Sequence, residues 1–471
     1  MRPEGQSTRR TVIRNMAALA GGLAFEPRPF NPTIAPSFRL ATFSADVTIP
    51  IGHPCMGGGI SPAKVVLDPL EARGIVLIPN DGRPIVIVAV DWCEIRNDAY
   101  DRWRVALAEA AGTDPSRVLV SCVHQHDAPV VDLTAERLLR EHRATGSVCD
   151  PEFHETAVRR VASALEKGLK SSVPITHFGT GMAKVDRVAA NRRYLGADGK
   201  PTFGRTSASR DAYAREQPEG TIDPYLRTLS FWDGDRPVAA MSVYATHPMS
   251  YYGRGEVSAD FIGLARRRRQ AEELSIFQIY MSGCSGNVTA GKYNNGAPEN
   301  RPVLADRIYR GMVDAWEATR RQPITTVTLQ TIPLRLSPRD DAGFTVADLT
   351  RRLTTDPKPF GQCLAAMGLS WRKRADARHA IDLPVLDLGA AQWLLLPGES
   401  YVEFQLHAQR VRPDSFVVTI GYGECATGYL PIERAIKEHD SNLNDWCWVA
   451  PGSERTLIGA IDAALSKSAR K

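Results

Sequence analysis

The chain has 471 residues, which is enough for one large α/β domain or two domains with a sizeable hydrophobic core. Its formal net charge of +5 is small for this length, and its composition is ordinary for a globular protein. Neither value favours a nucleic-acid-binding protein, so no nucleic-acid partner is expected.

The N-terminus resembles a twin-arginine export signal. The run Thr8-Arg9-Arg10-Thr11-Val12-Ile13-Arg14 precedes a short apolar stretch from Met16 to Phe25. That stretch is too short to serve as a stable membrane span. We therefore expect residues 1–35 to be signal and linker, and the protein to be exported to a periplasmic or extracellular location. A disordered basic tail is the alternative interpretation.

From Phe38 onward, strand-like and helix-like patterns follow one another, which predicts an α/β fold of mixed sheets flanked by helices. Strands are expected at residues 38–49, 73–78, 84–90, 117–123, 277–281, 327–336, 391–396 and 416–420, with two more within 229–246. Helices are expected at residues 99–111, 151–169, 263–273, 302–320, 347–353 and 401–408. The polar segment 192–224 is expected to be a long loop, and a sub-boundary within the domain 36–471 is expected near residue 338.

Two other features of the sequence are predicted to be structural. The run Arg266-Arg267-Arg268-Arg269 lies in a helical pattern and is expected on a solvated helix surface. The eight cysteines contain no C-x-x-C pair, which gives no indication of a zinc ribbon or a thioredoxin-like motif. Cys122 and Cys284 lie in apolar or small-residue runs and are expected to be packing residues.

The segment Ser121-Cys122-Val123-His124-Gln125-His126-Asp127 follows the apolar run Val118-Leu119-Val120, so it marks the end of a predicted buried strand. Side chains alternate along a strand, so His124 and His126 are expected on the same side. Two imidazoles where a strand meets a loop are well placed to hold a metal ion and a reacting group. A hydrogen-bonded surface pair is the alternative interpretation of this motif.

Two further metal-binding side chains follow apolar, strand-like runs. His247 comes after Val243-Tyr244-Ala245-Thr246, and Glu399 comes after the run 393–398. In open α/β sheets the ligand crevice lies at the carboxyl ends of the strands, which would bring these side chains together. Together with His124 they have the composition of a catalytic Zn²⁺ site with one open position. The sequence therefore predicts a metal site at the C-terminal ends of strands.

Seven short motifs follow one another between about Leu40 and Ala464. They are Asp68-Pro69-Leu70-Glu71-Ala72-Arg73, His124-Gln125-His126-Asp127-Ala128-Pro129, His247-Pro248-Met249-Ser250, Ser258-Ala259-Asp260-Phe261, Gly286-Asn287-Val288-Thr289-Ala290-Gly291, Pro397-Gly398-Glu399 and Gly428-Tyr429-Leu430-Pro431. In their order and combination they resemble the N-terminal catalytic domain of the neutral/alkaline (non-lysosomal) ceramidase family, in its short bacterial branch.

The resemblance implies a zinc-dependent amidase whose catalytic domain is residues 36–471. It implies that Zn²⁺ is bound by His124, His247, Glu399 and Tyr429, and that His126 hydrogen-bonds the scissile carbonyl or its oxyanion. Tyr429 could also stabilise the oxyanion, a catalytic role beside that of metal ligand. From spacing alone, Tyr429 would have been interpreted as a packing residue.

The sequence departs from the family's motifs at the position of the nucleophile. Thr289 stands where the family has a serine, and Asn287 replaces a neighbouring aspartate. A threonine can act as a nucleophile but is more hindered, and Ser285, Ser282 or a zinc-bound hydroxide are alternatives. The chain also ends soon after Tyr429, so the family's C-terminal immunoglobulin-like domain is expected to be missing.

Three functions are compatible with these residues. The first is an exported zinc hydrolase in lipid metabolism that cleaves an amide or ester of a small-molecule substrate. The second is a zinc-independent glycoside hydrolase in which Asp127, Asp260 and Glu399 supply acid and base. The third is a degenerate lipid- or carbohydrate-binding protein, which the changes at Thr289 and Asn287 suggest.

Overall fold

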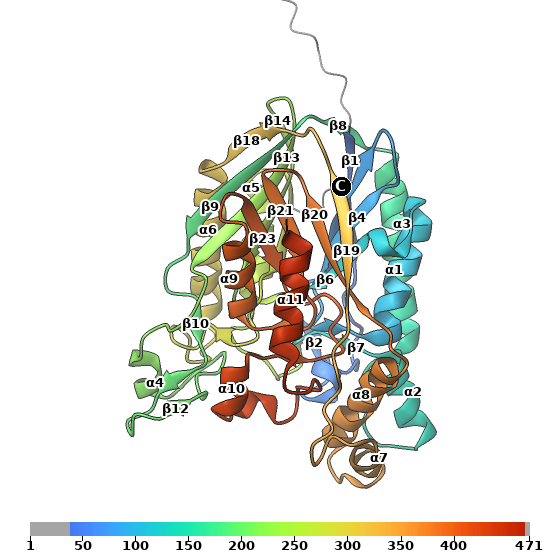
Figure 1. The fold of residues 1–471 in the computed structure, drawn as a ribbon, viewed down its shortest axis with the longest axis vertical. Helices are drawn as coiled ribbons and strands as arrows, with labels where there is room; N and C mark the ends of the chain where they lie inside the picture. The colour runs from blue at the N-terminus through green and yellow to red at the C-terminus, as the bar shows by residue number, and fades with distance from the viewer. Residues whose placement is uncertain (1–37, 467–471) are drawn as a thin grey trace, which may run out of the picture. The chain divides into compact units, whose positions relative to one another are not determined.

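The computed structural model describes residues 38–466, so the twin-arginine-like segment lies outside the described residues. Three mixed β-sheets, each covered by helices, make up this part of the chain (Figure 1). This architecture confirms the predicted α/β fold with mixed sheets flanked by helices.

The first sheet has the strand order β6-β4-β3-β1-β8, and helices α1 and α3 pack against it. Its elements are β1 (Phe38–Asp46), β3 (Glu71–Pro79), β4 (Ile85–Val90), α1 (Asn97–Ala111), β6 (Val118–Cys122), α3 (Pro151–Leu169) and β8 (Val173–Ile175). Alternate residues of its central strands face two different cores. Ile75 and Ile87 pack toward the other sheets, whereas Val76 and Val88 pack in the core that contains the helices. This sheet is therefore buried on both faces.

The second and third sheets have the orders β16-β14-β13-β9-β18 and β19-β20-β21-β23. Helices α5 and α6 pack on the second, and α9 and α11 pack on the third (Figure 1). The elements are β9 (His177–Lys184), β13 (Tyr225–Asp233), β14 (Arg236–Tyr244), α5 (Asp260–Glu272), β16 (Phe277–Ser282), α6 (Asn300–Glu317), β18 (Arg320–Pro323), β19 (Thr328–Leu334), β20 (Ile381–Asp387), β21 (Ala391–Leu395), α9 (Val402–Val411), β23 (Phe416–Ile420) and α11 (Ser453–Leu465).

Short elements occupy the connections between these sheets. The two-residue strands pair as β2 (Val65–Val66) with β15 (Glu256–Val257), β5 (Glu94–Ile95) with β7 (Val130–Val131), β10 (Ala190–Asn191) with β17 (Val288–Thr289), β11 (Tyr194–Leu195) with β12 (Pro201–Thr202), and β22 (Glu399–Ser400) with β24 (Tyr429–Leu430). The other helices are η1 (Met56–Gly58), η2 (Pro115–Arg117), α2 (Leu133–Glu141), α4 (Ala212–Glu216), α7 (Val346–Thr355), α8 (Pro359–Asp376), α10 (Glu433–Lys437) and η3 (Ser441–Leu443).

Each large sheet contains one parallel strand pair. The pairs are β4 with β6, β14 with β16, and β21 with β23. The carboxyl ends of these pairs are linked by backbone hydrogen bonds from Cys122 to Tyr422 and from Gly421 to Ser282. The three sheets therefore bring the carboxyl ends of their parallel strands to one place, where open α/β sheets bind ligands.

Most predicted elements are present with shifted ends, but two expectations need correction. The segment 192–224 is not one long loop, because it contains β11, β12 and α4. In addition, no strand was predicted at β9 or β20, and no helix at α2, α4, α8, α10 or α11. Helix α8 is buried over most of its middle, from Gly361 to Trp371, so it lacks the one-sided apolar pattern that marks a surface helix.

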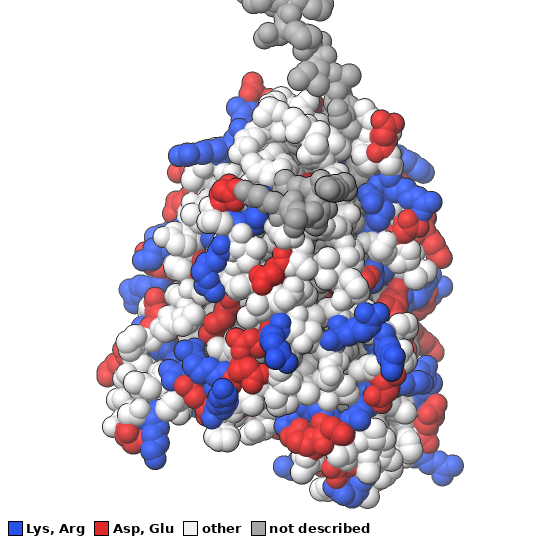
Figure 2. Space-filling view, in the orientation of Figure 1, with Lys and Arg blue, Asp and Glu red and all other residues white. Residues whose placement is uncertain are grey.

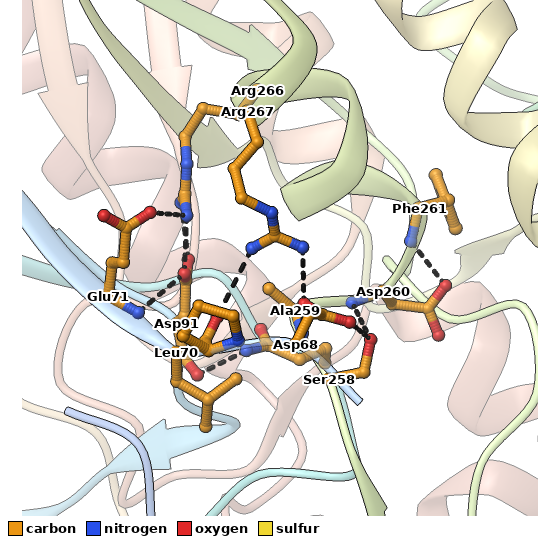
Figure 3. Close-up of polar contacts among 12 residues, drawn as sticks. Asp68, Leu70, Glu71, Asp91, Ser258, Ala259, Asp260, Phe261, Arg266 and Arg267 are labelled. Carbon is orange, nitrogen blue, oxygen red and sulfur yellow. Dashed lines mark hydrogen bonds and ion pairs between the residues drawn. The ribbon is translucent and has the colours of Figure 1, made fainter. Parts of the chain in front are cut away.

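The arginine run on α5 is not uniformly solvated, which corrects the second expectation. Arg266 is buried, and its guanidinium lies 2.7 Å from each oxygen of Asp91 and 2.9 Å from Glu71 (Figure 3). A helix turns about 100° per residue, so consecutive arginines face different surroundings. Arg268, two residues later, is half-exposed and pairs with Glu272 on the helix surface.

Charged side chains are mixed over the face of the molecule seen in Figure 2, where lysines and arginines alternate with acidic residues. Such a surface produces no strong field of one sign. Within residues 38–466, no helix is both long enough and apolar enough to cross a membrane.

Replacing Arg266 by methionine is expected to lower the free energy of unfolding by about 3–5 kcal/mol, because Asp91 would be left buried without its cation. Chemical denaturation of both proteins measures the difference. The matched control is Arg268→Met on the same helix, whose exposed ion pair contributes little to stability, so it should unfold like the wild type. Equal effects of the two substitutions would contradict the assigned role of Arg266.

Candidate metal centre

Two imidazoles converge on one carboxylate at the carboxyl ends of the three parallel strand pairs. Oε2 of Glu399 lies 3.2 Å from Nε2 of His124 and 3.0 Å from Nε2 of His247. All three side chains are at most 2% exposed, and their ligand atoms lie within 4.8 Å of one another. The structure thus brings together the three residues that the sequence predicted as metal ligands.

Backbone carbonyls fix the orientation of both imidazoles. Nδ1 of His124 lies 2.9 Å from the carbonyl oxygen of Cys93, and Nδ1 of His247 lies 2.6 Å from that of Ser285. Each Nδ1 therefore carries the proton and donates it, which leaves the lone pair of each Nε2 directed at Glu399. The small-residue loop after β16 therefore orients His247 through the carbonyl of Ser285.

The local backbone explains how His124 and Glu399 reach this position. The sequence predicted that strand alternation places His124 and His126 on one side. Strand β6 ends at Cys122, before both histidines, so strand alternation does not position them. His124 instead has φ 78°, a left-handed conformation that is strained for a non-glycine residue. Gly398 has φ 53°, and a Cβ there would lie 2.4 Å from Oγ1 of Thr427, so only glycine fits before Glu399.

The donor set fits a divalent cation better than it fits a hydrogen-bonded cluster. Burial and the nearby Arg192 lower the pKa of His247 to about 4, so this ring is neutral at pH 7. Its Nε2 and Oε2 of Glu399 are then two acceptor atoms 3.0 Å apart with no proton between them. Nε2 of His124 is buried and makes no hydrogen bond. A cation between the three atoms would relieve the repulsion, satisfy the orphaned nitrogen of His124, and replace the Arg192 N–H as the partner of Nε2 of His247.

The charges of the cluster are strongly perturbed. Burial favours the neutral form of Glu399, but His124 and His247 lower the pKa of Glu399 well below its usual range. Burial likewise opposes charging of His124, yet the Glu399 carboxylate raises the pKa of His124. Because metal ligands must be deprotonated, a bound cation would compete with protonation of Nε2 of His124.

A cavity of about 200 Å³ opens onto the cluster. The lining residues are Met56, Cys93, His124, His126, Phe360, Glu399, Tyr429, Ser441, Asn442, Asp445 and Trp446. The ring of His126 lies 5.3 Å from that of His124, and its Nδ1 has no hydrogen-bond partner. Burial and the neighbouring His124 hold the pKa of His126 well below its usual value, so it is neutral and can donate one N–H.

Tyr429 lies in register with Glu399 across the β22–β24 pair, and it lines the same cavity. Its hydroxyl accepts a hydrogen bond of 2.8 Å from Arg192, whose other terminal nitrogen donates to Nε2 of His247 at 3.0 Å. Burial raises the pKa of Tyr429 well above its usual value, so the phenol keeps its proton. Sequence reasoning missed Arg192, because it lies in a polar segment that carries no motif.

The hydroxyl groups predicted as nucleophiles lie outside the cavity lining. Thr289 is fully buried in β17, and its hydroxyl lies 3.2 Å from the carbonyl oxygens of Arg205 and Thr206. Ser285 pairs with the hydroxyl of Tyr422 at 2.7 Å, and Ser282 donates to the carbonyl of Val123 at 2.7 Å. None of the three hydroxyl groups therefore lines the cavity or hydrogen-bonds one of the predicted metal ligands.

The carboxylates of the glycosidase hypothesis also lie apart from the cavity lining. Asp260 accepts hydrogen bonds from Ser250 and pairs with Arg301 at 3.2 Å. Asp127 accepts from the backbone of Gly253 at 3.0 Å, and burial raises the pKa of Asp127 to about 6. Of the three proposed carboxylates, only Glu399 faces the cavity.

The fold that carries this cluster is that of the neutral ceramidases. Residues of this chain superpose on a neutral ceramidase from Pseudomonas aeruginosa with a TM-score of 0.65, at 15% identity, over 92% of this chain and 75% of that chain. A ceramidase complexed with C2 gives a TM-score of 0.67 at 14% identity, with the same coverage of both chains. No family model and no curated protein matches the sequence. The expected likeness to ceramidases is thus confirmed in the fold.

The metal cluster predicts about one zinc ion per chain in the purified wild-type protein. His247→Ala should lose this zinc, because only two of the three donors remain. Elemental mass spectrometry of protein reconstituted with zinc and then dialysed measures the content. The matched control is His379→Ala, which removes an exposed histidine and should leave zinc unchanged. A His247→Ala protein with full zinc content would exclude this cluster as the metal site.

Proposed function

We propose that this protein is a zinc-dependent hydrolase that cleaves an amide bond, or an ester bond, in a ceramide-like lipid. The observation that carries the proposal is the convergence of His124, His247 and Glu399, with both Nδ1 atoms tied to backbone carbonyls, at the base of a cavity. The ceramidase fold supports the choice of an amide, because two structures of that fold are named as ceramidases.

The metal would be held by Nε2 of His124, Nε2 of His247 and the carboxylate of Glu399, with Tyr429 as a further ligand or a hydrogen-bond donor. When bound, Zn²⁺ acts as a Lewis acid that activates water and polarises a carbonyl group at neutral pH. The neutral ring of His126 faces the same cavity and can donate its N–H to the carbonyl oxygen of the substrate. Arg192 adds a fixed positive charge beside Tyr429, where negative charge develops during attack.

Water is the proposed nucleophile, in preference to Thr289. The Thr289 hydroxyl is directed to backbone carbonyls of residues 205 and 206 rather than to the cavity. A protein nucleophile must come within hydrogen-bond reach of its base and within contact of the substrate carbonyl. The positions of Ser285 and Ser282, whose hydroxyls bind Tyr422 and Val123, support the same choice.

The walls of the cavity support a lipid substrate with a polar linkage. Met56, Phe360 and Trp446 supply apolar and aromatic surface, and Ser441 and Asn442 supply polar groups on the same lining. Binding sites of this kind are mostly apolar, with a few polar groups that fix orientation. An acyl chain against the apolar wall would present its amide carbonyl to His126.

Export is part of the proposal. The twin-arginine-like run from Thr8 to Arg14 supports translocation of the folded protein, and thus action in the periplasm or outside the cell. A zinc enzyme loaded before export fits this route.

His126→Ala is expected to lower kcat by about 10²–10³-fold on a short-chain N-acyl sphingosine, because one hydrogen bond to the developing oxyanion is lost. Zinc content should stay at the wild-type level, since His126 is not one of the three donors. Thr289→Val, which keeps the volume of the side chain, is the matched variant and should keep kcat within about twofold.

The opposite pattern would assign the nucleophile to Thr289. Loss of activity in folded, zinc-loaded Thr289→Val, with His126→Ala active, would contradict attack by water. Activity on glycosides that survives chelation would replace the zinc hydrolase by a carboxylate glycosidase. Tight lipid binding without turnover of any amide or ester would indicate a degenerate binding protein.

A further inference from the structure

Three consecutive aliphatic side chains are exposed on the surface loop that precedes β3. Val65 is 45% exposed, Val66 39% and Leu67 49%, so both faces of the two-residue strand β2 meet solvent. Ile51, at 62%, and Tyr252, at 39%, are exposed on the chain segments that pair with this loop. We call these five side chains the apolar rim. Contiguous exposed apolar side chains mark sites of contact with another molecule.

Backbone hydrogen bonds join the segments of the rim into one surface. The amides of Lys64 and Val65 donate to the carbonyl of Gly255, three residues after Tyr252. The amide of Gly52, next to Ile51, donates to the carbonyl of Ala63 at 2.7 Å. Strand β2 also pairs in parallel with β15. The rim is therefore formed by loops that are joined by backbone hydrogen bonds.

Asp68 anchors this surface to the body of the protein. Its carboxylate accepts hydrogen bonds from the Ser258 hydroxyl and the Ala259 amide, and it pairs with Arg267 (Figure 3). Ser258 and Ala259 directly precede α5, on which Arg266 binds Asp91 and Glu71. The carboxylate of Asp68 thus ties the loop that carries these apolar side chains to the start of α5.

One residue of the rim, Tyr252, contacts the lining of the cavity. The ring of Tyr252 packs edge-to-face on that of His126, with 4.7 Å between the centroids, and His126 lines the cavity. Met56, four residues after Gly52, lines the same cavity. A molecule that contacts the rim at Tyr252 therefore lies next to a residue that lines the cavity.

Basic side chains accompany the aliphatic ones. Lys64 is exposed directly before Val65, and Arg254 is exposed two residues after Tyr252. The carboxylate of Asp68 is already paired with Arg267. Aliphatic tips with flanking cations suit the boundary between anionic headgroups and acyl chains. Protein interfaces instead favour broad surfaces of aromatic residues, methionine and arginine.

We propose that the apolar rim inserts into the surface of lipid bilayers that contain anionic lipid, and that it holds the metal cavity against the membrane. A lipid substrate then moves from the bilayer to the cavity without exposing its acyl chains to water. The choice of a lipid surface rests on the proposed function for the class of substrate, but binding of the membrane does not require turnover.

The experiment measures flotation of the purified protein with vesicles of phosphatidylcholine and phosphatidylglycerol, for wild type and for V65S/V66S/L67S. The triple variant is expected to partition at least about tenfold more weakly, because the apolar area buried in the membrane is lost. The matched control is Leu274→Ser. Leu274 is 82% exposed just beyond the C-terminal end of α5, about 20 Å along the helix axis from Asp260, and its loss should not alter flotation.

Hydrolysis of a soluble short-chain amide separates this proposal from the proposed function. The triple variant should keep the wild-type rate on that substrate and lose rate on the same amide presented in vesicles. If the wild type floats with vesicles, the triple variant does not, and neither hydrolyses any amide or ester, the proposed function is contradicted and membrane insertion by the rim is supported. Equal flotation of wild type and triple variant would contradict membrane insertion by the rim. A wild-type protein that does not float with vesicles, but is a dimer in light scattering while the triple variant is a monomer, would also contradict it.

Discussion

The site depends on the close approach of three buried atoms that all prefer to accept a hydrogen bond or a positive charge. Nε2 of His124 and Nε2 of His247 each lie about a hydrogen-bond length from Oε2 of Glu399, although no donor hydrogen from the three lies between His247 and Glu399. Such an arrangement does not form spontaneously in water, because each atom would keep its own hydration. The fold must therefore hold the three ligand atoms together, and the backbone and side-chain contacts around the site do this.

The three parallel strand pairs supply that constraint. Each ligand follows the carboxyl end of a strand, and the ends are joined by backbone hydrogen bonds such as those from Cys122 to Tyr422 and from Gly421 to Ser282. Tyr422 also stacks on His124 with 4.2 Å between the ring centroids. A shift of one sheet would therefore break these bonds as well as move a ligand. The strained backbone of His124 is maintained by the same contacts.

The ligands could be predicted from the sequence because each follows an apolar run that reads as a buried strand. This local signal located His124, His247 and Glu399, and the motif resemblance added Tyr429. It could not find Arg192, whose role comes from contacts with residues 55 and 237 positions away in the chain. It also misplaced Arg266, since only the tertiary structure puts Asp91 and Glu71 beside that turn of α5. Helix α8 was not predicted, because a helix that is buried on almost every side has no polar face. Its sequence therefore lacks the 3.6-residue alternation of apolar and polar residues that marks a surface helix.

A second set of buried charges lies behind the ligands and connects them to the cavity wall. Glu94 follows Cys93, whose carbonyl oxygen orients His124, and its carboxylate accepts a hydrogen bond of 3.0 Å from the indole of Trp446. The other oxygen of Glu94 pairs with Arg96 at 2.7 Å, and all of these side chains except Trp446 are buried. Because Trp446 lines the cavity, one carboxylate ties the cavity wall to the segment that orients a ligand. Removing that carboxylate would leave Arg96 with Asp132 as its carboxylate partner and would release both features together. The shape of the cavity and the direction of Nε2 of His124 are therefore set by the same buried interaction.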